Sequence, residues 1–257
     1  MHPDLIWSNL NGLIWLLLML GPLIIFQRLL HREFQAVFYL ITHKLDVAVI
    51  LFAVLFLPGV FIHELSHLIV ARLVGVRTGR FSLIPRPLPG GKLQLGYVET
   101  VQTDWIRGSL IGAAPLIAGG LFVAFIANYQ MQLPLLWNFL QNGQTDLFWF
   151  GLKALPNIHY FWLWFYLAFV VSSTMLPSNS DRHAWVPLGL VLICLLGLAI
   201  IIGAGPWMLE KLAPTMNSFL KAISMLFGLS VLIHLILLLP IAGFHKILAR
   251  LRGFNIN

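Results

Sequence analysis

Charged residues are scarce in this sequence. Asp, Glu, Lys and Arg make up 10% of its 257 residues and hydrophobic residues make up 59%, whereas a soluble domain is about one quarter charged. Polar stretches long enough to form a separate soluble domain are also lacking. The sequence therefore predicts a single all-α, polytopic membrane domain that covers residues 1–257.

Cysteine is almost absent as well. Cys194 is the single cysteine and lies within an apolar run, which excludes an intrachain disulfide. The formal net charge of +7 comes from Lys and Arg residues that are spread over loops and ends. A nucleic-acid-binding protein would need a basic face in polar surroundings, so we expect these residues to contact the headgroups of the lipid bilayer instead.

Long apolar runs are what the chain has in abundance. Six are long enough to cross a hydrocarbon core of about 30 Å, at about residues 5–26, 46–72, 109–126, 160–176, 185–205 and 219–244. The first has no basic leader or cleavage site of small residues and is interpreted as a retained span. The third is rich in small residues, which predicts a central position in the bundle, and the aromatic segment 129–159 is typical of a membrane interface.

Lys and Arg are distributed unevenly over the loops between these runs. With both termini inside, ten of the 16 fall in cytoplasmic segments. Because cytoplasmic loops are enriched in Lys and Arg, we expect the N-terminus and the C-terminus in the cytoplasm. The expected location is the plasma membrane of a bacterium.

The one extended polar segment, 77–104, follows the second run. Its alternating residues at 81–84 and 92–100 flank Pro89, Gly90 and Gly91, which predicts a short membrane-associated β-hairpin. Two interpretations are open. The hairpin is an ordinary loop ribbon, or it is an edge strand near the functional site that pairs with an extended peptide.

The chemistry of the chain is concentrated in the second run, at His63-Glu64-Leu65-Ser66-His67. Residues four apart in a helix lie on one face, so both imidazoles can bind one divalent metal, typically zinc. Glu64 leaves the backbone about 100° round the helix from His63, where it can act as a general base on a metal-bound water. These three polar groups are costly in hydrocarbon unless a partner such as a metal compensates them.

A catalytic zinc usually has three protein ligands and a water, so one ligand is missing. We expect Asp181 to supply it, because Pro177 ends the fourth run and lets the following loop turn a carboxylate back into the bundle. Glu99 and His183 are the substitutes. A site with glutamate as third ligand, as in the prenyl-peptide proteases of the zinc type, would instead require Glu99 or Glu210.

These residues resemble the site-2 protease family of intramembrane zinc metalloproteases. In that family a His-Glu-x-x-His motif lies in one transmembrane helix, and an Asp two spans later, after an Asn-x-x-Pro segment, supplies the third ligand. The resemblance covers about residues 46–185 and includes the hairpin, which is similar in position to a β element of the family. It implies Zn²⁺ as the cofactor and His63, His67 and Asp181 as its ligands.

The resemblance also implies which residues contact a substrate. Pro177 matches the proline of the family, and Ser173 or Thr174 stands in place of its asparagine. Pro115 lies in an Ala-Pro-Leu segment that is similar to the Gly-Pro-Leu motif of the family, but Ala118 replaces the asparagine that follows it. These departures affect the residues that are expected to align the substrate backbone. From the hairpin, the expected substrate contacts are Tyr97 and Glu99.

Two functions follow from these patterns. The main hypothesis is an intramembrane zinc metalloprotease that hydrolyses a peptide bond of a membrane-protein substrate, with Glu64 as general base on zinc-bound water. The departures from the family motivate an alternative, which is a non-proteolytic scaffold or assembly factor with a structural metal site. An oligomer or a larger membrane complex is compatible with both. A transporter is disfavoured because the obvious acidic group within a span is the Glu64 of the motif itself.

Overall fold

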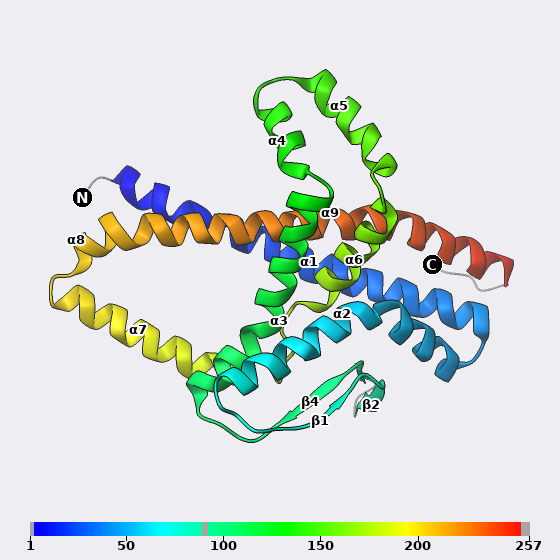
Figure 1. Cartoon of the computed structure of the whole chain (residues 1–257), viewed down its shortest axis with the longest axis horizontal. Helices are drawn as coiled ribbons and strands as arrows, with labels where there is room; N and C mark the ends of the chain where they lie inside the picture. The colour runs from blue at the N-terminus through cyan, green and yellow to red at the C-terminus, as the bar shows by residue number, and fades with distance from the viewer. Residues whose placement is uncertain (1–2, 89–91, 253–257) are drawn as a thin grey trace.

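The computed structural model describes residues 3–88 and 92–252, and most of these are helical (Figure 1). Apolar runs form helices in membranes because a helix satisfies its own backbone hydrogen bonds. The long helices are α1 (Pro3–Thr42), α2 (Leu45–Leu73), α3 (Trp105–Phe125) and α9 (Ala213–Leu251). The shorter ones are η1 (Ile126–Gln130), α4 (Leu133–Gln141), α5 (Thr145–Ala154), η2 (Leu155–Asn157), α6 (Phe161–Thr174), α7 (Trp185–Ile201), α8 (Gly205–Trp207) and η3 (Met208–Leu212).

The lengths of these helices identify a membrane protein. Four helical stretches in the described part of the chain are long and apolar enough to cross a bilayer, Leu10–Thr42, Leu45–Leu73, Trp105–Gln130 and Gly205–Leu251. A fifth span results if the helices at Thr145–Asn157 and Phe161–Thr174, which are bent by 93° at a short break, are taken together. The remaining predicted span is α7, whose 17 residues cover only about 26 Å at 1.5 Å per residue. None of its residues is buried.

Helices α1 and α9 pack side by side and run in the same direction (Figure 1). Near their beginnings, the Gly12 N–H donates to Asn217 Oδ1 (2.5 Å). Near their ends, His245 Nδ1 donates to Glu33 Oε2 (2.6 Å). Because the paired residue numbers increase together, the two helices are parallel.

This parallel pair bears on the position of the two termini. If α1 and α9 each cross the bilayer once, the N-terminus and the C-terminus lie on opposite sides. That arrangement differs from the prediction that both termini are cytoplasmic, which assumed six spans. It agrees with five spans, in which the short, unburied α7 does not complete a crossing.

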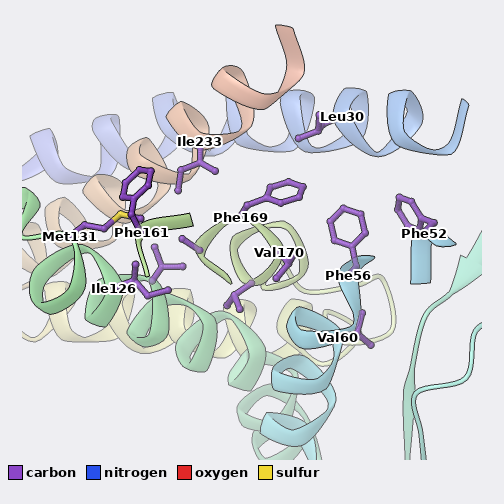
Figure 2. Packing of buried hydrophobic residues seen from close by; sticks show 13 residues of the cluster. Leu30, Phe52, Phe56, Val60, Ile126, Met131, Phe161, Phe169, Val170 and Ile233 are labelled. Carbon is purple, nitrogen blue, oxygen red and sulfur yellow. The ribbon is translucent and has the colours of Figure 1, made fainter. Parts of the chain in front are cut away.

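An aromatic core holds α6 against α2 (Figure 2). The rings of Phe52 and Phe56 on α2 lie 4.7 Å apart, and the Phe56 ring lies 5.5 Å from that of Phe169 on α6. Leu30 of α1 and Ile233 of α9 belong to the same buried cluster. Buried aromatic rings contribute large contact areas, so this cluster fixes α6 relative to the helix that carries the histidine motif.

Helices α2 and α6 come into close contact at Gly59. A Cβ at this position would collide with the Val170 carbonyl oxygen and would lie 2.6 Å from Thr174 Oγ1. A small residue therefore lets the two backbones come into contact. As a result, the C-terminal end of α6 lies beside the next turn of α2, which carries His63.

A β-ribbon connects α2 to α3, as the sequence predicted for 77–104. Its strands are β1 (Thr78–Ser82), β2 (Arg86–Leu88), β3 (Lys92–Gln94) and β4 (Tyr97–Thr100). Strand β1 pairs antiparallel with β4, and β2 pairs antiparallel with β3, which confirms the hairpin. The predicted turn at 89–91 lies outside the described residues. Figure 1 shows the ribbon beside the C-terminal half of α2.

The segment between α3 and α6 forms a helical hairpin of α4 and α5 that projects from the rest of the molecule (Figure 1). Trp137, Trp149 and Phe150 are exposed on it. Exposed aromatic side chains are typical of segments at a membrane interface. The sequence predicts residues 129–159 to lie there, whereas the five-span arrangement counts Thr145–Asn157 as the first part of the fifth span.

Candidate metal centre

His63 and His67 lie one turn apart on α2 and face each other. Their Nε2 atoms are 3.2 Å apart. His67 is buried and His63 is half-buried. The four-residue spacing in the sequence thus places both imidazoles on one face of the helix.

Each imidazole is fixed by a backbone carbonyl of another helix. His63 Nδ1 donates to the Thr174 carbonyl oxygen of α6 (2.6 Å), and His67 Nδ1 donates to the Ile111 carbonyl oxygen of α3 (2.9 Å). Since a carbonyl oxygen only accepts, these hydrogen bonds assign the proton of each neutral ring to Nδ1. Both Nε2 atoms are left with lone pairs. Ligating histidines in metal sites are commonly held in this way.

Asp181 brings a carboxylate to the same point from the loop between α6 and α7. Its Oδ1 lies 3.3 Å from His67 Nε2, and its Oδ2 lies 3.7 Å from His63 Nε2. The Ser178 N–H donates to Oδ2 (2.7 Å). A backbone N–H only donates, so this hydrogen bond favours the ionised form of Asp181, a carboxylate.

The three side chains fit a tetrahedral metal ion. Neighbouring ligands of a tetrahedral zinc lie about 3.3–3.4 Å apart when its bonds are about 2.0–2.1 Å long. The distances between the three ligand groups are 3.2, 3.3 and 3.7 Å. With both imidazoles protonated at Nδ1, two Nε2 lone pairs and a carboxylate point to one place, which is a donor set that could hold a metal ion. Within residues 3–88 and 92–252, His63, His67 and Asp181 form the one such group that could hold a metal.

Small residues on α3 allow the loop with Asp181 to come this close. A Cβ at Gly112 would collide with the Asp181 carbonyl oxygen, and one at Gly108 would lie 3.1 Å from Ala184 Cβ. Ser109 Oγ donates to the Ala184 carbonyl oxygen (2.9 Å) and ties the loop to α3. The small residues of α3 therefore provide the space in which the Asp181 loop packs against this helix.

Glu64 is buried beside the histidines and is in contact with the ribbon. A Cβ at Gly96, just before β4, would lie 2.9 Å from Glu64 Cγ and 2.8 Å from Val60 Cγ1. The ribbon backbone thus passes directly against α2 at this point. The start of β4 therefore lies close to the group formed by His63, His67 and Asp181, which is called the metal group below.

Two of the residues predicted to contact a substrate lie at the metal group. Pro177 lies in the loop that carries Asp181, and Thr174 provides the carbonyl that holds His63. The other two candidates from these helices are in the core. Ser173 is 1% exposed and its hydroxyl is bonded to His234, while Pro115 is buried within α3.

The ribbon candidates have partners within the ribbon. The Arg86 guanidinium lies 4.3 Å from the centre of the Tyr97 ring, and Glu99 Oε2 accepts from the Arg80 N–H (3.1 Å). Neither Glu99 nor the other substitute ligands, His183 and Glu210, belongs to the group that could hold a metal.

Sequence reasoning missed the groups that orient the two histidines. The carbonyls of Ile111 and Thr174 have no signal in a sequence, because every residue has a carbonyl. Gln27, which holds the end of α6, was also missed as part of the site, since it lies just after the first apolar run. His234 lies within an apolar run, and its hydrogen bond to another helix is what such a position predicts.

Comparisons with known protein families, with curated proteins and with solved structures find no match. The function is therefore inferred from the site itself. Its features are a convergent pair of histidines and a carboxylate, a buried glutamate next to them, and a β-ribbon against that glutamate.

Proposed function

We propose that this protein is an intramembrane zinc metalloprotease of the site-2 protease type. The observation that carries the proposal is the convergence of His63, His67 and Asp181 on one point beside the buried Glu64. Both histidines have the tautomer that leaves Nε2 free to bind a metal. Three protein ligands with a free fourth position are typical of catalytic rather than structural zinc.

The residues divide into ligands and a proton carrier. His63, His67 and Asp181 would hold Zn²⁺ through two Nε2 atoms and a carboxylate. When bound, zinc supplies Lewis-acid polarisation of a carbonyl and a lowered pKa for a water molecule. Glu64 would accept the proton of the attacking water and donate it to the leaving amine. Its position on α2 beside His63 supports this role.

The substrate class is a peptide segment of a membrane protein. The site is on an apolar helix long enough to span a bilayer, so a substrate reaches it from the membrane. A transmembrane segment must unwind locally to expose its carbonyl, and an unwound segment can add to the edge of a β-strand. The two-stranded β1–β4 pair has such edges, and β4 begins beside Glu64.

We place the metal centre toward the cytoplasmic side of the membrane. Helix α2 ends shortly after His67, and the basic residues Arg72, Arg77, Arg80 and Arg86 follow at once. Cytoplasmic segments are enriched in Arg and Lys. Since α1 precedes α2 and runs in the opposite direction, the N-terminal end of α1 lies on this side too (Figure 1).

Purified protein in lipid nanodiscs tests the proposal. Mass spectrometry of metals should find stoichiometric zinc in the wild type and in Glu64→Gln, and little in His67→Ala or Asp181→Ala. The wild type should cleave members of a panel of transmembrane peptides in a chelator-sensitive way, and Glu64→Gln should not. Wild-type protein without zinc, or Glu64→Gln with full cleavage, contradicts the proposal.

The second candidate is a non-proteolytic membrane scaffold with a structural metal. The burial of Ser173 and Pro115, which were predicted to align a substrate, favours it. In this case the wild type would bind zinc but cleave none of the peptides. Chelation would instead lower its thermal midpoint or dissociate it from partner proteins in the membrane.

A further inference from the structure

A second buried polar cluster joins three helices near the metal group. It consists of Gln27 on α1, Ser173 on α6 and His234 on α9. Ser173 is 1% exposed and His234 is 0% exposed. Buried polar groups are costly in a membrane protein unless they are hydrogen-bonded, so the partners of this cluster indicate its purpose.

Ser173 is held from two directions. His234 Nδ1 donates to the Ser230 carbonyl of its own helix (2.7 Å), which leaves Nε2 to accept from the Ser173 hydroxyl (2.8 Å). Gln27 Nε2 donates to the Ser173 carbonyl oxygen (2.5 Å). The side chain and the backbone of one residue are thus bound by α9 and by α1.

Pro177 explains why these bonds are needed at the end of α6. In a continued helix the Ser173 carbonyl would accept from the backbone N–H of residue 177, but proline has none. The Thr174 carbonyl would accept from the Ser178 N–H, but that group donates to Asp181. The Ser173 and Thr174 carbonyls are therefore free of helical partners. Gln27 takes the first and His63 takes the second.

We propose that Ser173, Gln27 and His234 are positioning residues of the metal centre. They fix the last turn of α6, so that the Thr174 carbonyl holds His63 with its Nε2 toward the metal. Ser173 would then act on the metal through Thr174 and His63 rather than by contact with a substrate. This inference rests on the proposed metal centre, but it does not depend on whether the protein cleaves peptides.

A matched pair of serines tests it. Ser172 and Ser173 are adjacent and equally buried, but the Ser172 hydroxyl donates only to Phe169 of its own helix (3.0 Å). Zinc affinity is measured by competition with a chromophoric chelator, on purified protein in nanodiscs. Ser173→Ala should weaken zinc binding by roughly tenfold, because loss of groups that support metal ligands typically costs 10- to 100-fold. Ser172→Ala should bind like the wild type.

The absorption spectrum of bound cobalt(II) provides a second measurement, which a change in protein stability alone does not alter. The visible absorption of bound cobalt should shift in Ser173→Ala, because His63 is no longer fixed, and should be unchanged in Ser172→Ala. If Ser173→Ala does not fold, Gln27→Met gives the same comparison, since it removes only the donor to the Ser173 carbonyl. Equal zinc affinity and equal cobalt spectra in wild type, Ser172→Ala and the Ser173 or Gln27 variant would overturn the inference.

Failure of the metal centre is distinguishable in the same experiment. Wild-type protein that binds neither zinc nor cobalt overturns the metal centre and this inference with it. Wild-type protein that binds zinc but cleaves no peptide overturns the protease proposal alone. In that case the Ser172–Ser173 comparison still decides the positioning role.

Discussion

The residue that lets Asp181 approach the two histidines has no side chain. Gly112 on α3 faces the backbone of the Asp181 loop so closely that a methyl group would collide with the Asp181 carbonyl oxygen. Gly120 on the same helix has space, since a Cβ there would lie 3.7 Å from its nearest neighbour, Leu226 Cδ1. The two glycines therefore differ in function although a sequence does not distinguish them.

We predict that Gly112→Ala destabilises the protein by about 1–3 kcal/mol, the usual cost of overpacking, and weakens zinc binding by displacing Asp181. Gly120→Ala should leave zinc binding unchanged, because alanine favours a helix over glycine and fits here. Thermal unfolding and a zinc competition titration measure the two effects. Equal zinc affinities of the two variants would show that Gly112 does not seat the ligand loop.

The side chains of the metal group could be predicted from the sequence, but the role of Ser173 could not. The spacing of His63 and His67 fixes their common face in any helix, and Pro177 indicates where the chain turns before Asp181. Ser173 was expected at the substrate because it stands in place of the asparagine that precedes the proline in the site-2 protease family. Its actual partner, His234, is 61 residues away in sequence, and local patterns carry no information on such a contact.

At the scale of elements, the end of α6 decides the geometry of the site. Pro177 stops the helix, which frees the Thr174 carbonyl for His63 and the Ser178 amide for Asp181. One helix break therefore orients two ligands that come from different segments. The break also leaves the Ser173 carbonyl to Gln27.

We predict that Pro177→Ala weakens zinc binding by more than about tenfold, comparable with the loss of other groups that support ligands. The restored backbone N–H would extend α6 and draw the Ser178 amide toward the Thr174 carbonyl. Pro134→Ala, in the first turn of α4, is the control and should bind zinc normally. A zinc titration in which both variants behave like the wild type contradicts this account.

The ribbon is the element that would meet the substrate. At Gly96 its backbone lies against Glu64 and Val60. The sequence predicted the strands from alternation and turn residues, but it left open whether the ribbon lies near the metal. The folded molecule answers that question, because the ribbon backbone at Gly96 packs directly against α2. The sequence gives no sign of this contact.

We predict that Gly96→Val lowers the rate of peptide cleavage by about 10- to 100-fold, since small displacements of positioning groups have effects of this size, and leaves zinc content unchanged. The added side chain would push the ribbon away from Glu64. Thr100→Val, at the exposed far end of β4, is the control. Full cleavage by Gly96→Val would exclude the ribbon from substrate binding.

At the scale of the whole molecule, α1 and α9 form a parallel pair, from which a membrane topology can be predicted. Contacts between Gly12 and Asn217 and between Glu33 and His245 fix the direction of the pair. The sequence predicted the apolar runs, but it did not show whether the number of membrane crossings is odd or even. Whether α7 crosses the bilayer depends on the length of the helix and on its packing against other helices. Neither the ends of the helix nor its lack of buried residues can be read from a run of apolar residues.

We predict that the N-terminus is cytoplasmic and the C-terminus is on the opposite side, because five spans place the ends on different sides. A C-terminal alkaline phosphatase fusion should be active and a C-terminal green fluorescent protein fusion dark, since each reporter works on one side only. The reverse pattern would place the C-terminus in the cytoplasm and contradict this prediction.

The length of α1 couples the proposed metal centre to the thickness of the bilayer. Its apolar stretch has 33 residues, about 50 Å of helix, whereas a hydrocarbon core is about 30 Å thick. Such a mismatch is relieved by tilt, and α9 must tilt with α1 because the two are packed together. Since Gln27 and His234 tie the end of α6 to this pair, the depth of the metal centre follows the tilt. Lipids with longer acyl chains would bring the pair more upright, and membrane thickness would select which peptide bond of a substrate reaches Glu64.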